Sequence, residues 1–447
     1  MTNSQARSQT EMEHTPCELT AQGSTCSESI THKDAMTENK LPQAPQIDPP
    51  PNGGARAWLQ VLAAYFLFFN TWGMINAFGA FQTYYNTALP RSASDIAWVG
   101  TLQGFLLMFM SGVTGPLFDR GYSRPLLITG TLAMSFGLMM TSLSNEYYQV
   151  FLAQGLVTGI GAGLLSVPGL AIISQYFSSK RGLATGIVAS GGSVGALLFP
   201  IIFSRLQIQI SFGWATRIIG FLVLSTLAMS TVLLRPRHPP AAKVRAMVDV
   251  SAFHSPEFLG ITLAMFLYLM GLYVPVFYIG LYAEQVLNVD KAFSFYLLSI
   301  LNATSIVGRA IVGPITDKIG ALNMMIPIAA STGILQFAWI SISSTAGVII
   351  FCIFYGFFSG AYVTLLGALL AGMAPQVNKV GTWMGMNFCI SSFGLLIGNP
   401  IAGALLQHGG FTSLQIFGGT MVFAGCLGFC LVRYIKLRKG VAWNMKA

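Results

Sequence analysis

The sequence predicts an all-α membrane protein in which twelve transmembrane helices form two related six-helix halves. Two observations predict this fold class: the composition and the spacing of apolar runs. Of the 447 residues, 53% are hydrophobic and only 9% are charged, whereas a soluble domain carries roughly 25% charged residues. With so few charges to face water, lipid must be the main solvent. The net charge of +9 then indicates anionic lipid at the cytoplasmic face rather than a nucleic acid.

Apolar runs between polar breaks predict the number of spans. A bilayer core of about 30 Å requires about 20 apolar residues per helix. Twelve runs meet this requirement, at residues 58–82, 95–117, 124–144, 148–174, 183–205, 213–234, 257–283, 293–316, 322–343, 346–372, 381–405 and 411–435.

Polar stretches divide the chain further. Residues 1–50 lack an apolar core and are rich in Ser, Thr, Glu, Gln and Pro, a composition that predicts disorder. The expected parts are a disordered cytoplasmic tail at 1–55, a six-helix bundle at 56–235, a central cytoplasmic loop at 236–256, a second bundle at 257–436 and a cytoplasmic tail at 437–447.

Lys and Arg in short loops indicate the orientation, because cytoplasmic loops carry an excess of both. Most basic residues follow even-numbered spans or lie in the C-terminal tail, as do Arg120, Arg124, Lys180, Arg181, Arg235, Arg237, Lys318, Lys379 and Arg438. The opposite face holds few, among them Arg91, Arg205, Arg217 and Lys291. Both termini are therefore expected in the cytoplasm, with the plasma membrane as the default location.

Two loops in equivalent places of the two halves share a pattern. After the second span the chain reads Gly115-Pro116-Leu117-Phe118-Asp119-Arg120-Gly121, and after the eighth it reads Gly313-Pro314-Ile315-Thr316-Asp317-Lys318-Ile319-Gly320. Glycine lets two helices approach, and an acid can cap a helix start and pair with basic groups. We expect gating loops whose contacts break and re-form as the halves rock, formed by Gly115, Asp119, Arg120, Arg124, Gly313, Asp317 and Lys318.

This loop pair resembles the cytoplasmic signature loop of the major facilitator superfamily. Within it, the chain resembles the monocarboxylate-porter family in its fungal branch. Two segments carry that likeness, Pro51-Asn52-Gly53-Gly54-Ala55-Arg56-Ala57-Trp58 before the first span and Tyr176-Phe177-Ser178-Ser179-Lys180-Arg181-Gly182-Leu183-Ala184-Thr185-Gly186 with Ala189-Ser190-Gly191-Gly192-Ser193-Val194-Gly195 at the fifth. The likeness covers about residues 50–436, and Asn52 stands where the family usually has Asp.

Arg309 is the clearest charge inside a predicted span. It precedes Asp317 by eight residues, so it lies roughly 12 Å deep at about 1.5 Å per residue, where a charge is costly and usually functional. A guanidinium matches a carboxylate through two parallel hydrogen bonds, which makes Arg309 a candidate anion anchor. The resemblance implies the same, because the family has a substrate-binding Arg there. The alternative is an Arg that bonds helix carbonyls or extends toward the cytoplasm.

Two positions depart from the family's pattern. Its best-known members carry an Asp one turn before this Arg, where the chain has Ser305, and a Lys in the first span, which aligns with Asn76. No Asp, Glu or His lies near the middle of any predicted span. We therefore expect no cofactor and no metal. Proton coupling through Arg309 and a substrate carboxylate stays open, although the sequence shows no relay.

Four further residues complete the candidate substrate site. Trp72 and Asn76 are four apart on one face of the first span, while Tyr355 and Phe358 lie in the aromatic tenth span, around Gly356 and Gly360. Helices softened by Gly or Pro often line transporter cavities. For any one aromatic residue, packing or a place in the interface belt is the competing interpretation. For Asn76 the alternative is a hydrogen bond between helices.

Together these patterns predict a secondary transporter that moves a small, acidic organic solute by alternating access. The resemblance implies export of a secondary metabolite. Uptake of a monocarboxylate or vitamin-like solute, and a non-transporting sensor on the same scaffold, are the alternatives. An enzyme is not expected, because the sequence shows no nucleophile–base set, metal cluster or phosphate loop. The expected partners are the solute and membrane lipid, with no nucleic acid, and the protein is expected to be monomeric.

Overall fold

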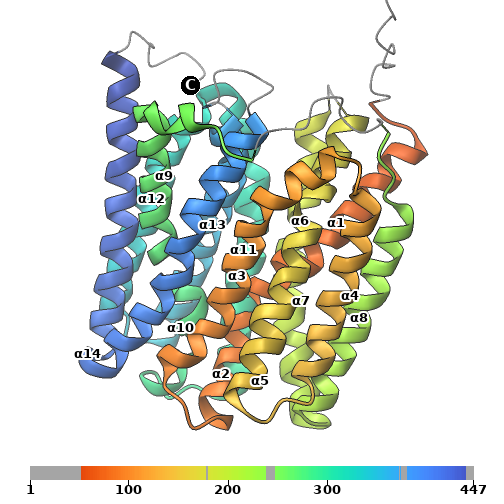
Figure 1. Ribbon diagram of the computed structural model, residues 1–447. Helices are drawn as coiled ribbons and strands as arrows, with labels where there is room; N and C mark the ends of the chain where they lie inside the picture. Colours follow the sequence, from red (N-terminus) through yellow and green to blue (C-terminus); the bar gives the residue numbers. More distant parts are fainter. Residues whose placement is uncertain (1–51, 178–179, 238–246, 372, 374–379, 439–447) are drawn as a thin grey trace, which may run out of the picture. The chain divides into compact units, whose positions relative to one another are not determined.

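A computed structural model describes residues 52–177, 180–237, 247–371, 373 and 380–438, and the regular elements in these ranges are all helices (Figure 1). All of them belong to one compact unit, Pro49–Ala447. Most of the predicted tail at 1–55, residues 238–246 of the central loop and residues 439–447 lie outside the described part, as does Lys379.

Nine elements are found among the described residues of the first half. They are α1 (Ala55–Asn76), α2 (Phe78–Ala88), α3 (Ala93–Asp119), α4 (Ser123–Thr141), α5 (Tyr147–Val150), the π-helix η1 (Phe151–Val157), α6 (Thr158–Tyr176), α7 (Arg181–Gln209) and α8 (Phe212–Leu233). Two predicted spans are thus interrupted: the first divides into α1 and α2, and the fourth begins with α5 and a π-helical turn before α6.

The described residues of the second half form eight elements. They are η2 (Val250–His254), α9 (Pro256–Leu272), α10 (Val274–Gln285), α11 (Lys291–Ile319), α12 (Ala321–Ala338), η3 (Trp339–Ser341), α13 (Thr345–Ala371) and α14 (Val380–Arg438). The seventh predicted span divides into α9 and α10, as the first did. The α14 stretch contains a non-helical residue, Gly410 with φ 69°, so it consists of two helices joined at a kink.

The prediction of an all-α membrane protein is confirmed, and the twelve predicted spans are consistent with the helices. Ten helical segments among the described residues are long and apolar enough to cross a bilayer. One of these is α14, whose kink at Gly410 separates the predicted eleventh and twelfth spans. The third predicted span corresponds to α4, which packs against α6 and α8.

Glycines allow the helices to pack closely within and between the halves. A Cβ added at Gly73 of α1 would lie 2.8 Å from Gly195 Cα of α7, and one at Gly161 of α6 would lie 2.9 Å from the Gly130 carbonyl oxygen of α4. Such contacts are shorter than a side chain tolerates. Small residues of this kind let apolar helices associate in lipid, where no hydrophobic force drives them together.

The two halves meet mainly where α3 packs on α14, α7 on α11, and α2 on α10 and α11. We call the end of the helices where α2 finishes the α2 end, and the opposite end, which carries Arg120, Arg235 and Arg438, the basic end; it lies at the top of Figure 1. The halves are in contact where α2 begins: the rings of Phe78 in α2 and Phe277 in α10 have centroids 5.1 Å apart.

Candidate functional site

A cavity lies between the two halves near the middle of the helices. It encloses about 330 Å³ of empty space, open solvent included. Its walls come from α1, the α9–α10 break, α11 and α13, and are formed by Asn76, Leu272, Tyr273, Val276, Leu301, Asn302, Ser305, Arg309, Ser359, Gly360 and Val363. Apolar surface with a few converging polar groups is the usual make-up of a site for a small organic ligand.

Arg309 lines this cavity, where we expected the anion anchor. Its side chain is half-buried, and its Nη1 donates a hydrogen bond of 2.9 Å to the Ala189 carbonyl oxygen of α7, in the other half. Its Nε is buried without a hydrogen-bond partner among the described residues. The alternative interpretation, an Arg that bonds helix carbonyls, therefore holds for Nη1 of the guanidinium. The position on the cavity wall leaves the group in reach of a solute.

Polar side chains on one face of α11, which we call the polar stripe, contact α7 near Arg309. Ser299 Oγ donates to the Leu197 carbonyl oxygen at 3.3 Å, and Asn302 Nδ2 donates to the Ala196 carbonyl oxygen at 3.3 Å. Pro200 explains the second bond, because proline lacks the N–H that would otherwise bond the carbonyl four residues earlier.

Ser305 continues the stripe, with its Oγ 3.1 Å from Ser193 Oγ of α7. Asn302 and Ser305 both line the cavity next to Arg309. They were absent from the predicted site residues, although the spacing of positions 302, 305 and 309 on an apolar helix is a readable sign of one polar face.

The α9–α10 break positions Tyr273, a further cavity residue that was not among the predicted site residues. Pro275 leaves the Gly271 carbonyl oxygen without its helical donor, and Gln336 Nε2 of α12 donates to that oxygen at 2.8 Å. The same Nε2 donates to the Tyr355 hydroxyl at 2.8 Å, and this hydroxyl donates to the Leu272 carbonyl oxygen at 2.6 Å. The carbonyls of Gly271 and Leu272 are therefore held by α12 and α13.

Of the other predicted substrate residues, one lines the cavity and three do not. Asn76 is in the wall, and its Nδ2 donates to the Trp72 carbonyl oxygen at 2.8 Å. Trp72 is half-buried against α7, where a Cβ at Gly192 would lie 2.8 Å from its own Cβ. Neither Tyr355 nor Phe358 is among the residues that line the cavity. Phe358 makes an edge contact with the neighbouring Phe357 ring, 5.2 Å away.

The two predicted gating loops share one backbone feature. Gly121 after α3 has φ 93° and Gly320 after α11 has φ 94°, a conformation that glycine adopts without strain. Asp119 is half-buried at the end of α3, and the side chains of Arg120 and Arg124 are exposed. A Cβ at Gly115 would have no neighbour within 4 Å, and one at Gly313 would meet only Thr364, at 3.9 Å. The side chains of Asp317 and Lys318 lie outside the described part.

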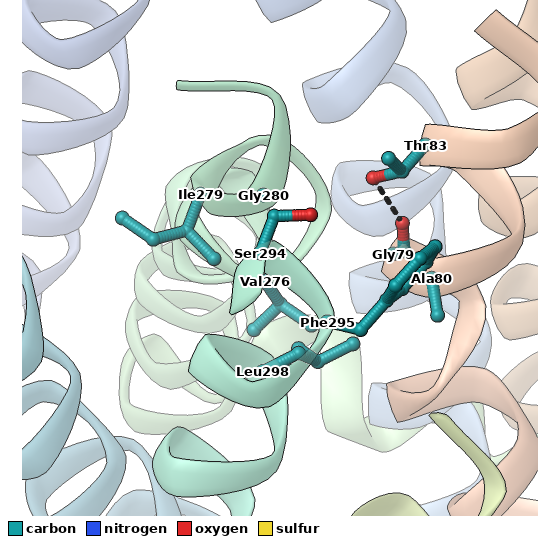
Figure 2. A pocket seen from close by; sticks show the side chains of 9 residues that line it. All are labelled: Gly79, Ala80, Thr83, Val276, Ile279, Gly280, Ser294, Phe295 and Leu298. Atoms are coloured by element: carbon teal, nitrogen blue, oxygen red, sulfur yellow. Dashed lines mark hydrogen bonds between the residues drawn. The ribbon is translucent and has the colours of Figure 1, made fainter. Parts of the chain in front are cut away.

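A second, smaller cavity lies between the first and the α2 end, where α2 meets α10 and α11 (Figure 2). Figure 2 shows Thr83 of α2 donating to the Gly79 carbonyl oxygen at 3.1 Å, with Ser294 across the space. Val276 borders both cavities. A Cβ added at Gly79 would lie 2.3 Å from the Val276 carbonyl oxygen, so α2 and α10 are in backbone contact here.

Metal binding has no support among the described residues, which contain no group of three or more His, Cys, Asp or Glu side chains able to hold an ion.

Known proteins resemble this chain over most of its length. Residues 61–376 match the Major Facilitator Superfamily. The MFS-type transporter dbaD of Emericella nidulans is 40% identical over 84% of this chain and 85% of its own length. The aspyridones efflux protein apdF of the same fungus is 40% identical over 90% of this chain and 81% of its own. A crystal structure of the nucleoside transporter NupG shares the fold, with a TM-score of 0.65 and 15% identity over 85% of this chain and 99% of that one.

Proposed function

Because the chain belongs to the major facilitator superfamily, we propose that it exports an acidic secondary metabolite by alternating access, with Arg309 as the anchor for the acid group. The supporting observation is the position of Arg309 on the wall of a cavity between the halves. The name of the related aspyridones efflux protein supports the direction of transport.

An acid group fits the chemistry of the cavity wall. The guanidinium presents five N–H donors and stays charged at any physiological pH. Of these donors, Nη1 is engaged with a neutral carbonyl, and Nε is buried without a hydrogen-bond partner among the described residues. A carboxylate or similar anion would satisfy both the charge and the open donors. The nearby side chains of Asn76, Asn302 and Ser305 can then orient the remaining polar atoms of the solute.

The rest of the wall favours a solute that also has an apolar part. Leu272, Val276, Leu301 and Val363 give it apolar surface, and Tyr273 adds an aromatic ring. The proposed substrate is therefore an organic acid with an apolar body.

We place the chain in the monocarboxylate-porter branch on the two segments quoted above. The basic residues at one end of the helices, among them Arg120, Arg124, Arg235 and Arg438, support a cytoplasmic location for that end and for both termini. The contact between α2 and α10 then closes the side away from the cytoplasm. A single chain in the plasma membrane suffices for this mechanism.

The test is a comparison of metabolites inside and outside producing cells, with the protein present, absent or carrying Arg309→Ala. We expect one or more organic acids to accumulate inside cells without the protein, and Arg309→Ala to lose at least nine-tenths of the export while reaching the membrane at normal levels. The matched control is Arg217→Ala. Arg217 Nε bonds Ser142 Oγ at 3.1 Å, between α8 and α4 and away from the cavity.

Two results would contradict the proposal at different points. Full export by Arg309→Ala would show that Arg309 is not the anchor, and the proposal that the protein is an exporter would stand. A set of retained metabolites without any acid group would remove the substrate class.

A further inference from the structure

The solute cavity contains one charge that its walls do not neutralise. Among the described residues that line it, only Arg309 is charged at neutral pH, and the others are apolar, amide, hydroxyl or phenol side chains. Its hydrogen-bond partner, the Ala189 carbonyl oxygen, is neutral. An empty cavity therefore carries about one positive charge at mid-depth, some ten residues before α11 ends.

The acids that follow position 50 lie away from this cavity. Each of the eight acidic residues after position 50 falls in the first or last turn of a helix, or caps one: Asp95, Asp119, Glu146, Asp249, Glu257, Glu284, Asp290 and Asp317. None of the eight is among the residues that line the cavity. Among the described residues, the cavity wall therefore offers no acid that could carry a proton or cancel the guanidinium charge during transport.

We propose that the membrane potential drives export by this protein, because the carrier moves with one positive charge when it is empty and with none when it holds a monoanion. The inference rests on the proposed function, an anion exporter with Arg309 at its site. It adds the energy source, which neither the fold nor the family decides.

The direction follows from the sign of the potential. The loaded carrier turns outward as a neutral complex, so the potential neither helps nor opposes that step. After the anion leaves, the empty carrier returns with its guanidinium, and an inside-negative potential draws that positive charge inward. One turn of the cycle therefore moves one negative charge out of the cell. No proton needs to bind to the protein at any stage.

The available energy is sufficient for export. One charge moved through 100 mV yields about 2.3 kcal/mol, which supports a gradient of about fifty-fold at 1.36 kcal/mol per factor of ten. Proton symport would instead make the cycle of a monoanion electroneutral, and the gradient would then follow the pH difference.

The first test needs no solute. Voltage steps applied to membranes containing the full-length protein should move a transient charge as empty carriers turn, up to about one elementary charge each. Arg309→Gln should lose most of this charge, whereas Arg309→Lys and the control Arg217→Gln should keep it. A wild-type protein without a transient, or an Arg309→Gln variant that keeps it, overturns the inference.

The second test uses 2-naphthalenesulfonate, an aromatic anion that stays ionised at any working pH. Proteoliposomes receive an inside-positive potential from a tenfold inward potassium gradient with valinomycin, which corresponds to about 59 mV. The probe should accumulate about tenfold, whichever way the protein is inserted, because the sign of net charge transport does not depend on orientation. Liposomes with Arg309→Gln should not accumulate it.

The outcomes separate the two proposals. Uptake that follows a pH gradient and ignores the potential would overturn the energy source and leave the anion exporter standing. Uptake no faster than in liposomes without protein would remove the anion site, and this inference would fall with it.

Discussion

The two halves of the molecule interrupt an equivalent helix in different ways. In the register set by Gly115 and Gly313, Ala77 between α1 and α2 corresponds to Pro275 at the start of α10. Ala77 keeps its N–H, which bonds the Gly73 carbonyl oxygen at 3.0 Å. Pro275 has none, so the Gly271 carbonyl oxygen takes its hydrogen bond from Gln336 of α12 instead.

Side chains of neighbouring helices therefore support the α9–α10 break, whereas the α1–α2 break has its own backbone hydrogen bond. At the α9–α10 break, Gln336 and Tyr355 bond the Gly271 and Leu272 carbonyl oxygens and so tie them to α12 and α13. At the α1–α2 break the backbone satisfies itself and needs no such support. Each hydrogen bond between helices in a membrane contributes about 0.6–2 kcal/mol. We infer that α10 is the fixed side of the contact at the α2 end and that α2 is the side that moves when this end opens.

The largest expected effect is at the point where the two broken helices touch. Gly79→Val would place a side chain against the Val276 carbonyl oxygen, which lies 2.3 Å from the position of an added Cβ. Because backbone cannot yield as a flexible side chain does, α2 and α10 should no longer close, and the transport rate should fall more than tenfold. Initial rates of export at matched membrane levels measure this.

Gly186→Ala is the control for that substitution, since a Cβ there would have no neighbour within 4 Å. It should transport at nearly the normal rate. Normal transport by Gly79→Val would show that α2 and α10 do not need to meet in the cycle.

A smaller effect is expected from Gln336→Leu, which removes the support of the α9–α10 break. The Gly271 carbonyl oxygen would lose its donor, and the Tyr355 hydroxyl would lose one of its hydrogen bonds. We expect a loss of about 1–2 kcal/mol in stability, seen as a lower Tm of the purified protein in detergent, with a several-fold weaker apparent affinity for solute because Tyr273 shifts. An unchanged Tm would show that the break holds without Gln336.

The smallest and most specific effect comes from making the second half like the first. Pro275→Ala restores an N–H at the position equivalent to Ala77, so the Gly271 carbonyl oxygen can regain a helical donor. In the Pro275→Ala background, Gln336→Leu should reduce stability by less than about half of the loss that it causes in the unmodified protein. A double-mutant cycle measures this coupling. Equal costs in the two backgrounds would show that Gln336 acts through Tyr355 and not through the missing N–H.

The fold could be predicted from composition because lipid imposes strict rules on length and polarity. The interruptions of the spans are less readable. Pro275 indicates the break before α10 in the sequence, but no proline indicates the break at Ala77. The kink at Gly410 lies between the predicted eleventh and twelfth spans, where a longer loop would ordinarily be expected.

The site could be predicted in part, for a physical reason that differs between residues. Arg309 was visible because a charge in the middle of a span is rare. The role of Tyr355 was not visible, since its hydroxyl bonds with Gln336 and with Leu272, and no pattern within its own helix points to those partners. Ser305 faces the cavity because α7 lies alongside α11, which is a tertiary fact.

Val276 belongs to the walls of both cavities. The first turn of α10 therefore separates the two cavities, and a shift of this turn that widens one cavity narrows the other. A solute leaving the larger cavity toward the α2 end must pass beside this turn as α2 moves away, so the same few atoms set both the room available while the solute is held and the width of its exit.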